Sequence, residues 1–91
     1  MTTIAVACDR VGDGWTCRVA VADETGSGEH RVGVRTIDLE RLLPGALAPE
    51  DLVRRSFEFL LEREPRTAIL PAFELPVIER YFPEYESTIR D

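Results

Sequence analysis

The chain has 91 residues, 44% of them apolar, and a formal net charge of −6 at pH 7. All 11 basic residues are Arg, and the absence of Lys excludes enzymes that need a Schiff-base, P-loop or general-base Lys. Because the Arg residues are scattered among Asp and Glu instead of clustered, binding to nucleic acid or to an anionic membrane surface is disfavoured.

The first part of the chain alternates apolar and polar residues, which is typical of half-buried antiparallel strands. Polar turns that contain glycine separate three such segments. The predicted strands cover residues about 3–9, 15–22 and 30–37. We expect them to form a three-stranded antiparallel meander.

Cys8 and Cys17 are the only thiols, and pairing the first two strands as a hairpin places them opposite each other, with Val6 opposite Val19. His30 is expected on the same face, so these side chains could converge on a metal ion. Three such side chains on a hydrophobic face more often belong to the protein core than to a metal site. No metal and no cofactor is therefore predicted. We expect both thiols to be free, because the N-terminus lacks a secretion signal and the cytoplasm is reducing.

The second half of the chain has the periodicity of helices. The predicted helices cover residues about 38–43, 49–64 and 76–82. Pro49 suits the first position of the longest helix and Pro65 ends it, while an irregular tail is expected after Pro83. Strands followed by helices predict an α+β fold, in which two to three helices pack on one sheet face of a single domain of residues 1–91.

About two thirds of the chain, from the third strand onward, resembles a known group of proteins. The segments that carry the resemblance are PEDLVRRSFEFLLEREP (49–65), ILPAF (69–73) and VIERYFPEYE (77–86). They are similar to short bacterial open reading frames of actinobacterial type, to which no activity is assigned. The resemblance implies a bacterial origin and a shared fold, and it implies no chemistry.

The motifs that could indicate catalysis each have a simpler interpretation. The two GxG motifs, at residues 12–14 and 26–28, lead into strands, so they predict hairpin turns and not a dinucleotide site. No Ser or Thr lies in the context of a nucleophile elbow. Neighbouring carboxylates share their segments with Arg, as on a solvated helix face. We therefore predict that the protein is not an enzyme.

Aromatic residues near the C-terminus are the best candidates for a binding role, because Tyr, Trp and Arg dominate interface hot spots. Most of these aromatics are expected to complete the small core instead. Phe82 and Tyr85 fall at or beyond the end of the last predicted helix, so exposure is expected first for these two. Ala5 and Ala7 give the first strand a small, flat face, and its edge carries no charge before Asp9. The possible interface residues are thus Ala5, Ala7, Phe82 and Tyr85.

Taken together, these patterns predict a cytoplasmic protein-interaction or accessory module that forms a homodimer through its first strand. The alternative is a small acidic regulatory protein of antitoxin type, which would neutralise a basic partner by charge complementarity. No nucleic acid is expected among the partners because acidic residues are in excess. No membrane is expected either, since no apolar run approaches the roughly 20 residues that span a bilayer.

Overall fold

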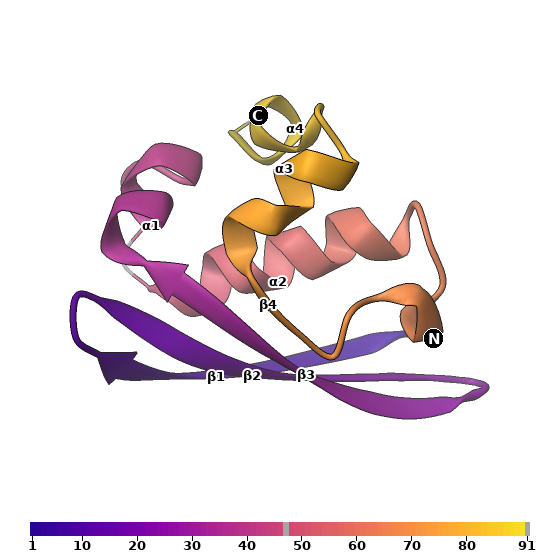
Figure 1. The fold of residues 1–91 in the computed structure, drawn as a ribbon. Helices are drawn as coiled ribbons and strands as arrows, with labels where there is room; N and C mark the ends of the chain where they lie inside the picture. Colours follow the sequence, from indigo (N-terminus) through magenta and orange to yellow (C-terminus); the bar gives the residue numbers. More distant parts are fainter. Residues whose placement is uncertain (47, 91) are drawn as a thin grey trace.

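The computed structural model describes residues 1–46 and 48–90 and arranges them as one β-sheet with its helices on a single face (Figure 1). The strands, which lie in the sheet in chain order, are β1 (Thr3–Val11), β2 (Gly14–Asp23), β3 (Gly26–Arg35) and β4 (Ala72–Glu74). The helices are α1 (Thr36–Leu42), α2 (Pro49–Leu61), α3 (Ile78–Tyr81) and α4 (Tyr85–Arg90), with short 3-10 helices η1 (Arg66–Ala68) and η2 (Leu75–Val77). The predicted α+β class is confirmed.

The first three strands form the predicted antiparallel ladder. Its register pairs Cys8 with Cys17, as the alternation of side chains predicts. The second hairpin is tighter than expected, because the Asp23 carboxylate accepts a hydrogen bond from the Thr25 N–H (2.8 Å) across the turn. The ladder therefore continues through Gly26, and β3 begins about four residues earlier than predicted.

A fourth strand corrects the predicted three-stranded meander. β4 lies beside β3 and runs parallel to it, with Phe73 opposite Val32, so the sheet is mixed. The Arg31 N–H donates to the Pro71 carbonyl (2.8 Å) at the start of this pairing. A strand of three residues is too short to produce a recognisable alternation, which is why the sequence pattern did not predict it.

The C-terminal segment corrects a second prediction. An irregular tail was expected after Pro83, but the structure has helix α4 there. Tyr85 and Ile89, one helical turn apart, are both buried. A six-residue helix is marginal in water, so the burial of these two side chains is what stabilises it.

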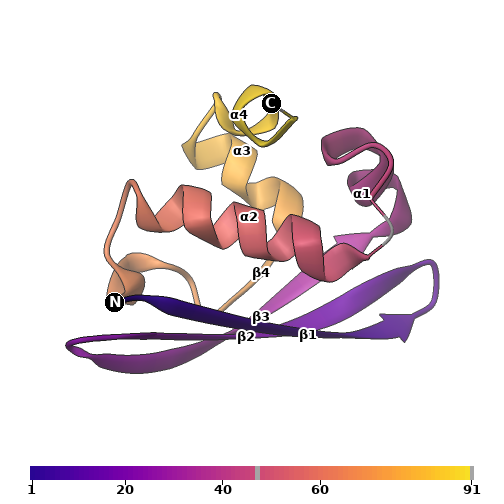
Figure 2. The same cartoon turned by 180° about the vertical axis from the view of Figure 1, so that it is seen from behind.

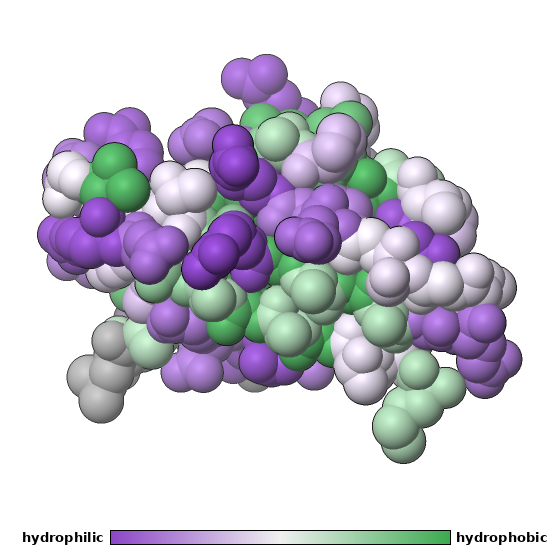
Figure 3. All heavy atoms as spheres, turned by 90° about the horizontal axis from the view of Figure 1, so that it is seen from below, coloured by the Kyte–Doolittle hydropathy of each residue, from purple (hydrophilic) through white to green (hydrophobic). Residues whose placement is uncertain are grey.

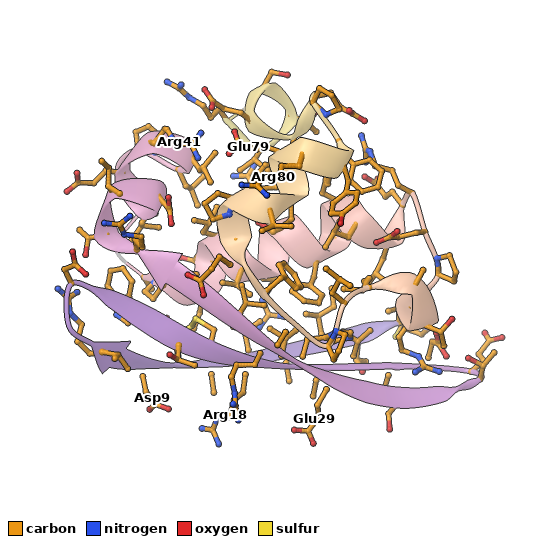
Figure 4. All side chains as sticks on the ribbon, viewed as in Figure 1. Asp9, Arg18, Glu29, Arg41, Glu79 and Arg80 are labelled. Carbon is orange, nitrogen blue, oxygen red and sulfur yellow. A yellow bond between two sulfur atoms is a disulfide. The ribbon has the colours of Figure 1, made fainter. Side chains whose placement is uncertain are left out.

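The hydrophobic core lies between the sheet and α2, which runs over β1 when the molecule is seen from behind (Figure 2). Its sheet side is Val19, Val21, Val32 and Val34, and its α2 side is Leu52, Val53, Phe57 and Leu60. Among the described residues, no helix covers the opposite face of the sheet, on which small apolar and polar side chains are mixed (Figure 3). Asp9, Arg18 and Glu29 point outward from that face (Figure 4).

Candidate functional site

The four predicted interface residues do not lie together. Ala5 and Ala7 are exposed on β1, as expected for an edge strand. Phe82 is half-buried among the helices. Tyr85 is fully buried, so the prediction that it is exposed is wrong. Its position at the first turn of α4, not in a tail, turns its ring toward the core.

The edge of β1 is partly covered by charged side chains of α2. The Cys8 N–H donates to the Glu50 carboxylate (3.4 Å), and the Arg54 guanidinium donates to the Ile4 carbonyl. Both backbone groups point away from β2, since groups on alternate residues of an antiparallel edge strand face outward. Charged side chains on an edge oppose the addition of another strand. The uncharged start of β1 therefore does not leave this edge unprotected, because side chains of α2 cover part of it.

A disulfide joins β1 to β2. Cys8 and Cys17 are bonded to each other, with their Cα atoms 4.0 Å apart. The predicted opposition of the two residues is confirmed, and the prediction of free thiols is wrong. Because Cys17 is fully buried and Cys8 is half-buried, the bond lies on the helix side of the sheet, where it fixes the edge strand to its neighbour.

A buried pair of hydroxyl groups connects α2 to α4. The Ser56 hydroxyl donates to the Leu52 carbonyl (2.8 Å) and is hydrogen-bonded to the Tyr85 hydroxyl (2.5 Å). Burial raises the pKa of Tyr85 above its ordinary value of about 10, because ionisation there would place a charge in an apolar interior. Ser56 is completely inaccessible to solvent, so this pair acts as an anchor for the C-terminal helix.

An ion-pair cluster holds the outer helices together. Arg41 of α1 donates to the Glu79 carboxylate of α3 (2.9 and 3.0 Å) and to Glu86 of α4. The bidentate hydrogen bond with Glu79 raises the pKa of Arg41 above its ordinary value. Arg41 and Glu79 point toward each other from α1 and α3 (Figure 4). The cluster ties three helices of the upper layer into one unit.

The most site-like hollow lies between β4, η1 and α3, and we call it the β4–α3 groove. Its volume is about 330 Å3, near the lower end of the range for small-molecule sites. Its apolar lining includes Leu60, Leu70, Phe73, Val77, Tyr81 and Phe82. Leu70 and Tyr81 are 46% and 67% exposed, so two of the most exposed large apolar side chains of the described chain meet at this one hollow.

Specific contacts fix the walls of this groove. The His30 imidazole is hydrogen-bonded through Nδ1 to the Leu70 carbonyl (2.8 Å), which holds the segment that leads into β4. Since a carbonyl only accepts, Nδ1 carries the proton. On the opposite wall the Phe82 ring meets Phe59 edge to face, with centroids 5.8 Å apart. These contacts hold both walls of the groove in place.

Arg66 anchors the part of the chain that turns from α2 toward β4. Its guanidinium donates to Asp23 (3.4 Å) and to the Thr25 hydroxyl (3.2 Å) at the tip of the β2–β3 hairpin. It also lies over Gly28, where an added Cβ would come within 3.3 Å of it. The hydrogen bonds from Thr25 hold the pKa of Asp23 below its usual range. Glycine is favoured at position 26 because its φ is +145°, whereas a side chain at position 28 would only require the Arg66 guanidinium to shift slightly.

A second hollow, of about 550 Å3, lies beside β1 between α2 and α4. It is larger than the β4–α3 groove but is a different environment, because Arg55, Glu58 and Glu62 line it. Only Glu64 is charged among the residues that line the β4–α3 groove. Apolar anchoring of a partner therefore favours the smaller hollow.

Searches for a metal-binding group, a membrane-spanning helix and similar proteins identified no further feature of the described chain. Within residues 1–46 and 48–90, no group of three or more His, Cys, Asp or Glu side chains is arranged to hold a metal ion. In the same part of the chain, no helix has the length and apolar content needed to cross a membrane. Comparison with protein-family models, curated proteins and solved structures gave no match.

Sequence reasoning missed the β4–α3 groove for a definable reason. It predicts that Tyr85 is exposed beyond the last helix, whereas Tyr85 is buried and Tyr81 is the tyrosine exposed at the groove. The spacing of Tyr85 and Ile89 fits one face of a helix, but α4 has only six residues, too few for this spacing to stand out as a period. Nothing in the pattern of residues 70–74 indicated that this segment joins the sheet.

Proposed function

We propose that the protein is a non-enzymatic interaction module that docks a partner through the β4–α3 groove. The observation that carries this proposal is the convergence of exposed Leu70 and Tyr81 on one apolar hollow. Large apolar side chains left in water at a concave site are typical of binding surfaces. Tyr is among the residues that contribute most to interface affinity.

The placement of the reactive side chains supports a binding role over a catalytic one. The hydroxyls of Ser56 and Tyr85 are buried against each other, away from any substrate. The single imidazole, on His30, is 7% exposed and is engaged by the Leu70 carbonyl. A nucleophile and a base within reach of a bound substrate are what acyl or phosphoryl transfer would need, and the groove is instead lined by apolar side chains.

Self-association remains part of the proposal, but pairing through β1 requires that side chains now covering this edge move away. Pairing of β1 with β1 of a second copy needs the outward groups of Ile4 and Cys8, which Glu50 and Arg54 occupy. A homodimer formed in this way must displace both side chains. A dimer that uses the β4–α3 groove has no such cost.

A cytoplasmic location also remains a proposal, and the disulfide provides its test. In a reducing cytoplasm Cys8 and Cys17 are expected as thiols, whereas an oxidising compartment keeps the bond. Alkylation of intact cells before lysis, followed by mass spectrometry, measures the fraction that is bonded. A fully bonded protein would contradict the cytoplasmic location, and a reduced protein would support it.

Affinity purification from the native cell tests the interaction proposal. The wild type is compared with Tyr81→Ser and Leu70→Ser, and Ile37→Ser is the matched control because Ile37 is a similarly exposed apolar residue (61%) outside the groove. We expect a dominant co-purifying protein that both groove variants lose and the control retains. Equal recovery with all four proteins would contradict a role for the groove.

A further inference from the structure

The outer side of β4 presents backbone groups to a further strand. In its parallel pairing with β3, the carbonyl of Pro71 accepts from the Arg31 N–H, and the register places Ala72 opposite Arg31. By the alternation of a parallel ladder, Phe73 directs its N–H and carbonyl toward β3. Ala72 then directs its N–H and carbonyl, and Glu74 its N–H, away from the sheet. Both residues are exposed.

These outward groups border the β4–α3 groove. Side chains alternate between the two faces of a strand, so Phe73 lies on the helix side of β4 and forms part of the groove, while Ala72 and Glu74 lie on the open face. A strand added beside β4 would direct every second side chain to the helix side in the same way. Such side chains would enter the hollow between Leu70 and Tyr81.

The charge around the groove indicates which kind of residue a bound segment would carry beside the apolar side chain that enters the groove. Glu64 lines the groove and forms no ion pair with any described residue. The two Arg residues that flank it in sequence are engaged elsewhere, Arg63 with Glu84 and Arg66 with Asp23. A cation supplied by a partner would therefore meet an uncompensated carboxylate, in a protein whose net charge is −6.

We propose that the occupant is an extended segment of a partner protein that adds to the sheet beside β4. In this arrangement a large apolar or aromatic side chain of the segment fills the groove, and an Arg or Lys of the segment lies against Glu64. Backbone hydrogen bonds and alternating side-chain pockets are the usual basis of such strand addition. The inference rests on the proposed function and specifies its partner chemistry.

Selection of peptides tests the chemistry of the occupant. Random heptapeptides displayed on phage are selected on the wild type and counter-selected on Tyr81→Ser, a change at an exposed position that melting experiments can confirm as folded. We expect enrichment of sequences with a large apolar or aromatic residue next to Arg or Lys. Selection on Glu64→Gln should retain the apolar residue and lose the preference for a cation. Enrichment of acidic sequences, or no enrichment, would overturn the inference.

Amide shifts on binding of an enriched peptide test the mode of binding. In 15N-labelled protein we expect the largest changes at Ala72 and Glu74, and an affinity at least about tenfold weaker for Tyr81→Ser. Methylation of alternate peptide nitrogens should abolish binding, because it removes the ladder donors. Shifts confined to β1 would overturn the inference and indicate the other edge. If Tyr81→Ser loses the cellular partner while no peptide is enriched, the proposed function stands and strand addition does not.

Discussion

The two edges of the sheet differ in a way that their lengths do not suggest. β1 has nine residues and is uncharged before Asp9, yet Glu50 and Arg54 occupy two of its outward groups and a disulfide fixes it to β2. β4 has three residues, and its outer side is uncovered and continues into an apolar groove. The long edge is the protected one, and the short edge is the accessible one.

This difference shows that the availability of an edge depends on what packs beside it. At β1 the neighbouring α2 places side chains of opposite charge one helical turn apart, which suits a backbone that exposes both donors and acceptors. At β4 the neighbouring segments, η1 and α3, leave a hollow. Strand length and composition alone would rank the two edges in the wrong order.

The largest expected effect concerns the support beneath β4. Phe57 is fully buried, with its ring 6.2 Å from that of Phe73 and 5.3 Å from His30. Phe57→Ala should lower the free energy of unfolding by about 3–5 kcal/mol, because it leaves a cavity under the sheet. Urea denaturation measures the change. Glu58→Ala, at an exposed position of the same helix, is the control, and an unchanged midpoint for Phe57→Ala would contradict this core.

The next effect concerns the fixed edge. Reduction of the Cys8–Cys17 disulfide should lower the free energy of unfolding by about 2–3 kcal/mol, the expected contribution of a short closed loop. Amide exchange should then increase more in β1 than in β4. The double variant Cys8→Ser/Cys17→Ser is the control, because reductant should leave its stability unchanged. Equal stability of the oxidised and reduced wild type would contradict a role for the bond in holding β1.

A smaller effect concerns the contact between α2 and α4. Tyr85→Phe removes the hydrogen bond to Ser56 and should lower the free energy of unfolding by about 1–2 kcal/mol. The remaining hydroxyl of Ser56 keeps its bond to the Leu52 carbonyl, which limits the loss. Thermal denaturation at pH 7 measures it. Tyr81→Phe is the control, since Tyr81 is 67% exposed and should change little.

The same residue predicts a dependence on alkaline pH. Burial raises the pKa of Tyr85 in the folded protein above its unfolded value of about 10. The contribution of the neutral phenol is therefore fully present below pH 10 and is lost as the unfolded state releases its proton above that pH. Stability of the wild type should fall above pH 10 more steeply than that of Tyr85→Phe. If the stability of the two proteins fell equally above pH 10, the raised pKa of Tyr85 would be contradicted.

The parts of the fold that the sequence predicts are those with long regular patterns. The pairing of Cys8 with Cys17 follows from the two-residue period of strands, because a shift of one residue would turn every apolar side chain outward. The main helix follows from the apolar stripe that contains Phe57. β4 and α4 have three and six residues, and no period can be recognised over such lengths. They form because tertiary contacts select them.

The candidate site was less predictable than the fold for the same reason. The sequence predicts Phe82 as an interface residue, and Phe82 lines the β4–α3 groove. It predicts the same for Tyr85, but the short helix that turns the Tyr85 ring inward cannot be recognised from local pattern. The protection of β1 depends on side chains of Glu50 and Arg54, more than forty residues away in sequence. Contacts of that range are outside the reach of periodicity.

The variant with the smallest expected change in stability tests most directly whether side chains of α2 protect the edge of β1. Glu50→Ala/Arg54→Ala removes both edge contacts at no change in net charge and should alter the free energy of unfolding by no more than about 1 kcal/mol. Because it uncovers the outward groups of Ile4 and Cys8, the variant should self-associate more tightly than the wild type in sedimentation equilibrium at micromolar concentration. The matched control is Asp51→Ala/Arg55→Ala, which removes the same charges from exposed neighbouring positions of α2. If the two double variants associate equally, β1 is not the route to a dimer, and β4 is left as the accessible edge.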